Sequence, residues 1–160
     1  NPVNSISLRE VADIYSGRMQ RWPDGNTVRP VMRQPGDDNT QQIARLSSAI
    51  ADALKNAEQR SGLSFASIDQ EAADKMESIA GAFGVTTLAL IRSESRKLKA
   101  LAIDGVAPTP ENAAAGRYPL QKHFYLILPK EPAPGVSELV AFIRSPAGRK
   151  ILEKNGHTLP

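Results

Sequence analysis

A polar turn at residues 33–40, R-Q-P-G-D-D-N-T, carries the side chains of this 160-residue chain that are best placed to do chemistry. It separates an apolar run, 28–32, from a long amphipathic run, 41–58, so a buried strand is predicted to lead through the turn into a helix. Such a helix points its first unpaired N–H groups and the positive end of its dipole at the turn, which suits an oxyanion. The turn already contains two carboxylates, Asp37 and Asp38. They either fill the anion position themselves or help to select its ligand.

The same turn also has a purely structural interpretation. Asp and Asn are preferred residues at helix N-caps, and Asn39 followed by Gln42 has the spacing of a capping box. Taken alone, the turn is therefore explained best as the cap of the helix that follows it.

The sequence lacks the common catalytic motifs. It contains no cysteine and no G-x-S-x-G, H-E-x-x-H or G-x-x-x-x-G-K-[ST] motif. His123 and His157 lie far apart, at the start of a predicted strand and just past a predicted helix, and are expected to be surface or structural residues. The adjacent side chains of Asp37 and Asp38 should diverge, whereas acid–base catalysis needs two carboxylates that converge on one bond. We therefore predict no enzyme activity, no catalytic residue and no cofactor.

Charged clusters elsewhere in the chain have the spacing of solvated helix faces. The acidic cluster follows no EF-hand pattern, so no metal site is predicted, and the basic cluster contains no aromatic residue for base stacking. The 20 Lys and Arg residues exceed the 17 Asp and Glu residues by only +3 and are scattered, which argues against a nucleic-acid partner. No run approaches the ~18 apolar residues of a membrane span, so no membrane insertion is expected. The clusters are Asp69, Glu71, Asp74 and Glu77, and Arg92, Arg96, Lys97 and Lys99.

Strand-like and helical segments alternate along the chain, which predicts an α/β fold with a central mixed sheet flanked by helices. Pro30 suggests that the first of the strands listed here bends or lies near a sheet edge. A capping box at 67–70 is expected to open the third helix, and Thr109 with Pro110 to open the fourth. The predicted helices are 8–16, 41–58, 67–76, 110–115, 136–144 and 146–154, and the predicted strands are 28–32, 98–103 and 124–128.

Five segments, in this order, resemble those of phosphate-type periplasmic substrate-binding proteins of ABC transporters, members of the type II periplasmic binding protein superfamily. The first, at 7–25, is similar to the family's L-x-x-x-x-A-D-I-F-x-G-x-x-x-x-W pattern, and the last, at 142–160, to its C-terminal F-x-x-S-x-x-G-x-x-I-L-x-x-x-G-x-x-P. Between them, 28–40 takes the place of the R-x-x-G-S-G-T anion loop, 79–85 resembles P-G-A-I-G, and 118–127 resembles the hinge return.

The resemblance implies a two-lobed protein of the Venus-flytrap kind that delivers a small oxyanion, with phosphate favoured, to the permease of an ABC uptake transporter. Residues 1–117 would form the second ligand-binding lobe, and 118–160 the hinge return strand and C-terminal helices. The family's first lobe is absent from this chain. A periplasmic location is implied, although the first residues, N-P-V-N, lack the regions of a signal peptide. Without the first lobe, the return segment is expected to pack differently or to pair with another copy as a homodimer.

The resemblance also assigns the ligand-binding residues. Arg33 would supply charge, Thr40 a hydroxyl group and the turn its N–H groups, whereas Asp38 and Asn39 replace the family's Ser and Gly. A carboxylate repels an anion by about 4 kcal/mol at 4 Å for an effective dielectric of 20, but it can accept a hydrogen bond from the acidic proton that phosphate retains near neutral pH. At most one aspartate is therefore expected to face the ligand. Further candidates for shape, selectivity or a second binding group are Gly36, Asp37, Asp69 and Gln70.

An alternative function on the same fold remains open. The chain could be a non-transport sensory or scaffold module that no longer binds an oxyanion, which the two aspartates would explain directly.

Overall fold

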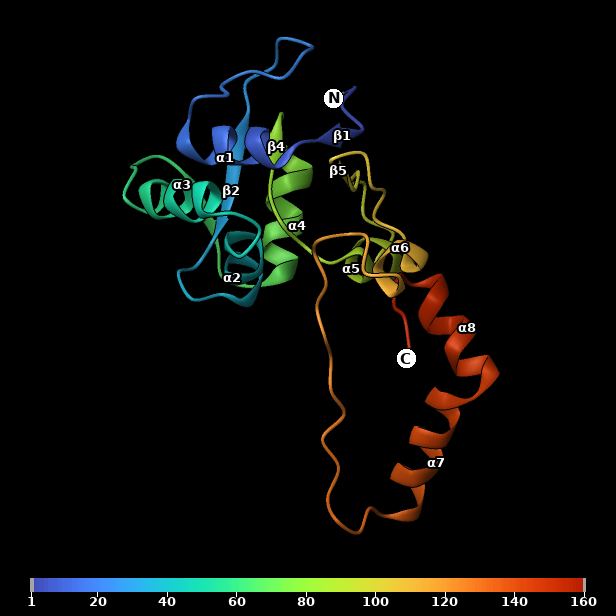
Figure 1. Cartoon of the computed structure of the whole chain (residues 1–160). Coiled ribbons are helices and arrows are strands. Elements are labelled where there is room, and N and C mark those ends of the chain that lie inside the picture. The colour runs from blue at the N-terminus through green and yellow to red at the C-terminus, as the bar shows by residue number, and fades with distance from the viewer. Residues whose placement is uncertain (1, 160) are drawn as a thin grey trace.

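The computed structural model describes residues 2–159, in which a small parallel sheet is flanked by helices (Figure 1). No helix within this range is long and apolar enough to cross a membrane. The elements are β1 (Ser5–Ile6), α1 (Leu8–Ser16), β2 (Arg29–Arg33), α2 (Asp38–Ala44), α3 (Ser48–Glu58), β3 (Ser64–Ala66), α4 (Asp69–Ser78), β4 (Ala82–Phe83), α5 (Leu88–Ser93), β5 (Ala102–Ile103), α6 (Pro110–Ala114), α7 (Pro134–Arg144) and α8 (Pro146–Lys154).

The strands form two parallel groups. The main sheet has the order β3-β2-β4, with Arg33 opposite Ala66 and Arg29 opposite Ala82, and β1 pairs with β5 separately. Antiparallel pairing among the described residues is limited to two isolated bridges. The predicted α/β class with flanking helices is confirmed.

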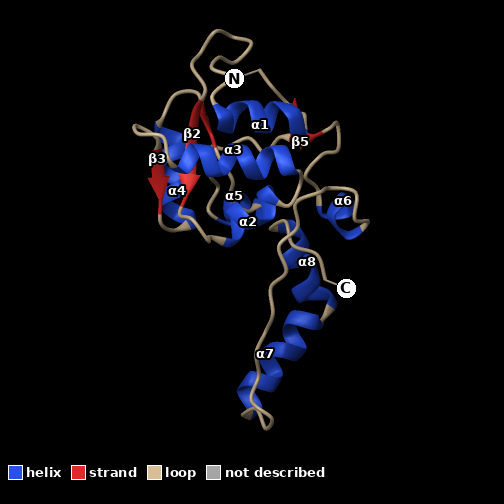
Figure 2. Cartoon of the chain, turned by 60° about the vertical axis from the view of Figure 1, so that its left-hand side comes forward, coloured by secondary structure: helices blue, strands red, loops and turns tan. Residues whose placement is uncertain are grey.

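Strand β2 divides the core into two parts. Met32 lies in the larger cluster with residues of α1 and α3, which pack side by side, whereas Val31 packs against Ala72 and Met76 of α4. Helices α1 and α3 accordingly lie on one face of β2, and α4 lies on the opposite face (Figures 1 and 2). Because side chains alternate along a strand, Arg33 shares the α4 face with Val31.

Helix α1 has the predicted bounds and the predicted cap. Ser7 Oγ accepts a hydrogen bond from the Glu10 N–H, and the Glu10 side chain accepts one from the Ser7 N–H, which completes the capping box. Gly17 ends the helix with φ 79°. The segment that follows is attached to the sheet by Trp22, which is 3 % exposed and donates from Nε1 to the Gly81 carbonyl at 2.9 Å.

The single long helix predicted over 41–58 is wrong. The chain instead forms α2 and α3, because Ser47 adopts an extended conformation between them and its Oγ accepts a hydrogen bond from the Ile50 N–H at 3.2 Å. The apolar spacing survives this break, since Ile43 and Ile50 both enter the same core cluster. Periodicity alone therefore did not reveal the boundary.

The capping box predicted at 67–70 is also wrong. Ile68 is the N-cap of α4 and makes no side-chain cap. The Ser67 N–H instead donates to Glu71 Oε2 at 2.7 Å, so a carboxylate one position beyond Gln70 receives the bond.

Pro30 does not mark an edge strand, because β2 is the centre of its sheet. The ladder to β3 begins at Val31, and at Pro30 the strand pairs only with β4, opposite Phe83. The missing N–H of Pro30 therefore falls where the β3 ladder has not yet begun.

The strand predicted over 124–128 does not form, and His123 consequently lies in a loop. This segment and the C-terminal helices extend away from the rest of the chain (Figures 1 and 2). The apolar residues here are exposed, most of all Tyr125 at 81 % and Ile127 at 94 %. Helices α7 and α8 are confirmed, with α7 beginning two residues earlier than predicted at Pro134, and the strand predicted over 98–103 is reduced to β5.

Candidate functional site

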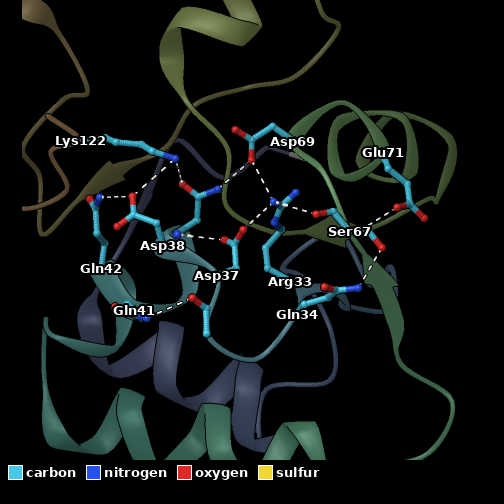
Figure 3. Close-up of polar contacts among 12 residues, drawn as sticks. Arg33, Gln34, Asp37, Asp38, Gln41, Gln42, Ser67, Asp69, Glu71 and Lys122 are labelled. Atoms are coloured by element: carbon cyan, nitrogen blue, oxygen red, sulfur yellow. Dashed lines mark hydrogen bonds and ion pairs between the residues drawn. The ribbon is translucent and has the colours of Figure 1, made fainter. Parts of the chain in front are cut away.

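The candidate site lies at the carboxyl ends of β2 and β3. Because the two strands are parallel and Arg33 is opposite Ala66, the loops that follow them emerge side by side and lead into α2 and α4. Open α/β sheets bind ligands at such an edge. Figure 3 shows side chains of the two loops contacting one another. Lys122, from the segment before α7, reaches Asp38 and Asn39 of the β2–α2 loop.

Arg33 is at the centre of this network. The residue is 7 % exposed, and its Nη2 lies 2.7 Å from Asp37 Oδ2, 3.2 Å from Asp69 Oδ1 and 3.5 Å from the Ser67 carbonyl oxygen. Its Nε and Nη1 atoms are buried and have no hydrogen-bond partner within residues 2–159. A buried donor without a partner costs about 1–3 kcal/mol, so this guanidinium group is held in place on one side and unsatisfied on the other.

Asp37 caps α2 with its own side chain. Oδ1 accepts the Asn39 N–H at 2.9 Å while Oδ2 accepts from Arg33. Burial raises the pKa of the Asp37 carboxyl, but the hydrogen bond and charge of Arg33 and the N–H groups of Asn39 and Thr40 outweigh burial and hold that pKa below its usual value. Asp37 therefore occupies part of the anion position at the end of this helix.

Asn39 connects the two loops. It is 5 % exposed, and its Nδ2 donates to Asp69 Oδ1 at 2.8 Å while its Oδ1 accepts from Lys122 Nζ at 3.4 Å. These partners satisfy a buried amide on both sides, which fixes its orientation.

Asp38 diverges from Asp37, as predicted for neighbouring side chains in a turn. Its side chain is 52 % exposed, and Oδ2 accepts from Gln42 Nε2 at 2.8 Å and lies 3.5 Å from Lys122 Nζ. The two carboxylates therefore serve different partners.

The remaining predicted residues are divided between the site and its surroundings. Gly36 has φ 85°, a conformation that favours glycine, and its carbonyl accepts from Gln41 Nε2 at 3.0 Å. Thr40 lines a small cavity together with Arg33 and Val85. Gln70 is exposed and contributes no side-chain hydrogen bond to the network of described residues.

A second layer of contacts holds the β3–α4 loop. Ser67 Oγ accepts from Gln34 Nε2 at 3.0 Å, and the Ser67 N–H donates to Glu71 (Figure 3). Glu71 also pairs with Lys75 at 2.7 Å. These bonds keep the Ser67 carbonyl and Asp69 beside Arg33.

Sequence reasoning missed two residues of this region, Lys122 and Thr86. The Thr86 hydroxyl is buried without a hydrogen-bond partner in the described part of the chain. Strand β4 ends at Phe83, which pairs with Pro30, so Thr86 and Arg33 each lie three residues beyond this pair along the chain. The family-like segment 79–85 ends one residue before Thr86, and this adjacency was the available signal.

A family model described as a PBP superfamily domain matches residues 1–147. The chain belongs to the PBP superfamily. The match spans most of the chain and includes every residue of the candidate site, so the resemblance inferred from the five segments is confirmed at the level of the family. No curated protein matches the sequence.

Solved structures with this fold include three proteins connected with phosphate transport. A candidate phosphate ABC transporter substrate-binding protein with bound phosphate, from Clostridium perfringens, is 20% identical with a TM-score of 0.76, and covers 100% of this chain and 65% of its own. PstS from Borrelia burgdorferi is 18% identical with a TM-score of 0.63, and the alignment covers 97% of this chain and 63% of that protein. An ABC-type phosphate transport receptor from Vibrio cholerae is 17% identical with a TM-score of 0.63, and the alignment covers 100% of this chain and 66% of that protein. At these identities the likeness shows a shared fold, and the present chain spans slightly less than two thirds of each relative.

Proposed function

We propose that this chain is part of the substrate-binding component of an ABC uptake transporter and binds a small oxyanion, with phosphate as the favoured ligand. The PBP superfamily membership and the fold shared with phosphate-binding relatives support a binding rather than a catalytic role. A periplasmic location and delivery to a transporter permease follow from the same proposal.

The observation that carries the proposal is the buried, half-satisfied guanidinium of Arg33. Buried polar atoms nearly always have partners, so two unpartnered guanidinium nitrogens indicate an acceptor that binds there. An oxyanion offers several acceptor oxygens and a negative charge, and arginine binds such groups strongly. Thr40 lines a small cavity that Arg33 also lines, and its hydroxyl is proposed as a further donor.

The surrounding carboxylates favour phosphate over sulfate. Asp37, Asp38 and Asp69 outnumber the cations Arg33 and Lys122 by one negative charge. Phosphate near neutral pH still carries an acidic O–H that can donate a hydrogen bond to a carboxylate, whereas sulfate carries none. Sulfate therefore meets repulsion without a compensating hydrogen bond.

We further propose that residues 1–117 form the second lobe of a two-lobed protein and that 118–160 return to its first lobe. The apolar residues of 124–128, with Leu139 and Phe142 of α7, are exposed, as expected of a surface that another lobe covers. The longer chains of the solved relatives agree with an additional lobe. An enclosing lobe desolvates the ligand and completes its hydrogen bonds, so this chain by itself should bind weakly.

Titration of the 160-residue chain with inorganic phosphate, followed by the NMR shifts of backbone amides 36–40, tests the proposal. Wild-type chain should show saturable shifts, Arg33→Gln should abolish them, and Thr40→Val should weaken binding by about fivefold. Thr27→Val, which removes an exposed hydroxyl far from the site, is the matched control and should bind as wild type. An unresponsive wild type, or a Thr40→Val variant that binds equally well, contradicts the proposal.

One observation favours the alternative of a sensory or scaffold module without an oxyanion. The Asp37 carboxylate already accepts the Asn39 N–H and pairs with Arg33, as a bound anion could. On this alternative, millimolar phosphate leaves the melting temperature of the wild type unchanged, and Asp37→Asn does not create a phosphate response.

A further inference from the structure

Lys122 brings a positive charge from the C-terminal part of the chain to the turn before α2. Its Nζ lies 3.5 Å from Asp38 Oδ2 and 3.4 Å from the Oδ1 of Asn39, a residue 83 positions earlier. Figure 3 shows the side chain extending toward Asp38 from a separate segment. The lysine thus joins the return segment to the candidate site.

Contacts on both sides of Lys122 determine where it can reach. Just before it, Gln121 Nε2 donates to the Ala113 carbonyl of α6 at 2.8 Å. Just after it, the Phe124 ring lies edge-on to His157, with 5.9 Å between centroids, and 5.8 Å from Lys122 Nζ. The lysine side chain is 26 % exposed. It is therefore held over the turn instead of extending into solvent.

The charges at the turn explain why a cation is needed there. Arg33 pairs with Asp37 and Asp69. Asp38 receives a hydrogen bond from the neutral Gln42 and has Lys122 as its cationic partner. Without Lys122, the Asp38 charge would be uncompensated at the turn and would repel an approaching anion.

We infer that Lys122 is a specificity-determining residue of the oxyanion site: it offsets the charge of Asp38 and so allows a protonated oxyanion to bind beside an acceptor carboxylate. The inference rests on the proposed function and adds to it a residue from the return segment. Asp38 stays available to accept a hydrogen bond from the ligand's acidic O–H, while its repulsion of the ligand is reduced. The ligand class that fits is an oxyanion with an acidic proton, such as monohydrogen phosphate, in preference to sulfate.

A cycle of variants in the 160-residue chain tests this inference, with phosphate and sulfate each titrated against the amide shifts of 36–40. Lys122→Gln should weaken phosphate binding by about tenfold, and Lys122→Arg should retain it within about threefold. Asp38→Asn combined with Lys122→Gln should recover most of that loss but should bind sulfate and phosphate alike. Lys130→Gln, which removes an exposed lysine from the same segment, is the matched control and should change neither affinity.

The outcomes separate this inference from the function on which it rests. A wild-type chain without a phosphate response contradicts the proposed function and the inference with it. A wild-type response that Lys122→Gln leaves unchanged contradicts the inference alone. Loss of binding in Lys122→Gln that the added Asp38→Asn does not recover also contradicts it, because the lysine would then act by a route other than Asp38. Melting temperatures measured without phosphate verify that each variant is folded.

Discussion

The Nη2 atom of Arg33, at the end of β2, lies 2.7 Å from Oδ2 of Asp37, the residue that caps α2. One carboxylate therefore holds the arginine and closes the helix end at the same time. The pairing leaves Nε and Nη1 of Arg33 without partners among residues 2–159, so a ligand would meet a cation whose orientation is already set.

Asp37→Asn should destabilise the chain by about 1–3 kcal/mol, because the buried Arg33 loses the nearer of its two charged partners, Asp37 and Asp69. The folded-state pKa of Asp37 is lowered, so its contribution to stability is present above its unfolded pKa of about 3.9 and is lost as pH falls through the lower folded value. The difference in melting temperature between wild type and Asp37→Asn should therefore be constant from pH 7 to about pH 5 and should shrink below about pH 4. A difference that stays constant down to about pH 2.5 would contradict this assignment.

Thr86→Val should separate a structural role of the hydroxyl from a role in binding. The hydroxyl is buried without a partner, so an isosteric methyl group should leave the melting temperature unchanged or raise it in the absence of phosphate. If the hydroxyl donates to the ligand, the stabilisation by millimolar phosphate should fall. A clear loss of stability without phosphate would indicate instead that the hydroxyl has a structural partner.

Gly81→Ala should destabilise the chain more than Gly25→Ala. Both glycines have positive φ, 75° and 85°, so both substitutions strain the backbone. A Cβ at Gly81 would also collide with the Thr27 carbonyl oxygen, whereas a Cβ at Gly25 meets no atom within 4 Å. We expect about 1 kcal/mol for Gly25→Ala and at least about 2 kcal/mol more for Gly81→Ala, measured by urea unfolding. Equal losses would contradict the close approach.

Ile127→Glu should reduce self-association of the isolated chain without lowering its melting temperature. Ile127 is 94 % exposed, so the change removes no intramolecular packing but places a charge in an apolar stretch. Sedimentation velocity of both proteins measures the association. Ile50→Ala is a control for which the two effects should be reversed. Because Ile50 is fully buried, its truncation should cost about 2–5 kcal/mol of stability and should leave self-association unchanged.

Local signals predicted those parts of the fold that depend on neighbouring residues. The capping box at Ser7 and Glu10, and Thr109 followed by Pro110, placed the starts of α1 and α6 correctly. The break between α2 and α3 was missed because the apolar spacing continues through it, although Ser47 provided a cap. The segment 124–128 has the composition of a strand but has no neighbouring strand among the residues that the structure describes, and strand formation requires one.

The site followed the same rule: contacts between residues close in sequence could be predicted, and contacts between distant residues could not. Arg33 and Asp37 lie four residues apart and belong to one recognisable turn, so their proximity was within reach of sequence reasoning. Lys122 approaches Asn39 across 83 residues, and Thr86 follows the β2–β4 pair Pro30–Phe83 by three residues on β4's side, as Arg33 does on β2's side. Lys122 lies within the family-like segment 118–127 and Thr86 just beyond 79–85, but neither pattern singles these residues out. Both positions depend on tertiary packing that composition and periodicity do not encode.

Trp22 is the one tryptophan of the sequence, and its surroundings determine what its fluorescence would report. The indole is buried, donates to the Gly81 carbonyl and lies 6.1 Å from the Phe83 ring, so unfolding of this region should shift the emission to longer wavelength. Gly81 precedes β4, whose residues pair with the first two residues of β2. Arg33 is the last residue of β2, so the candidate site lies at the opposite end of this strand from Trp22. The emission spectrum should thus follow unfolding while remaining insensitive to ligand, which provides an optical signal for stability that is independent of binding.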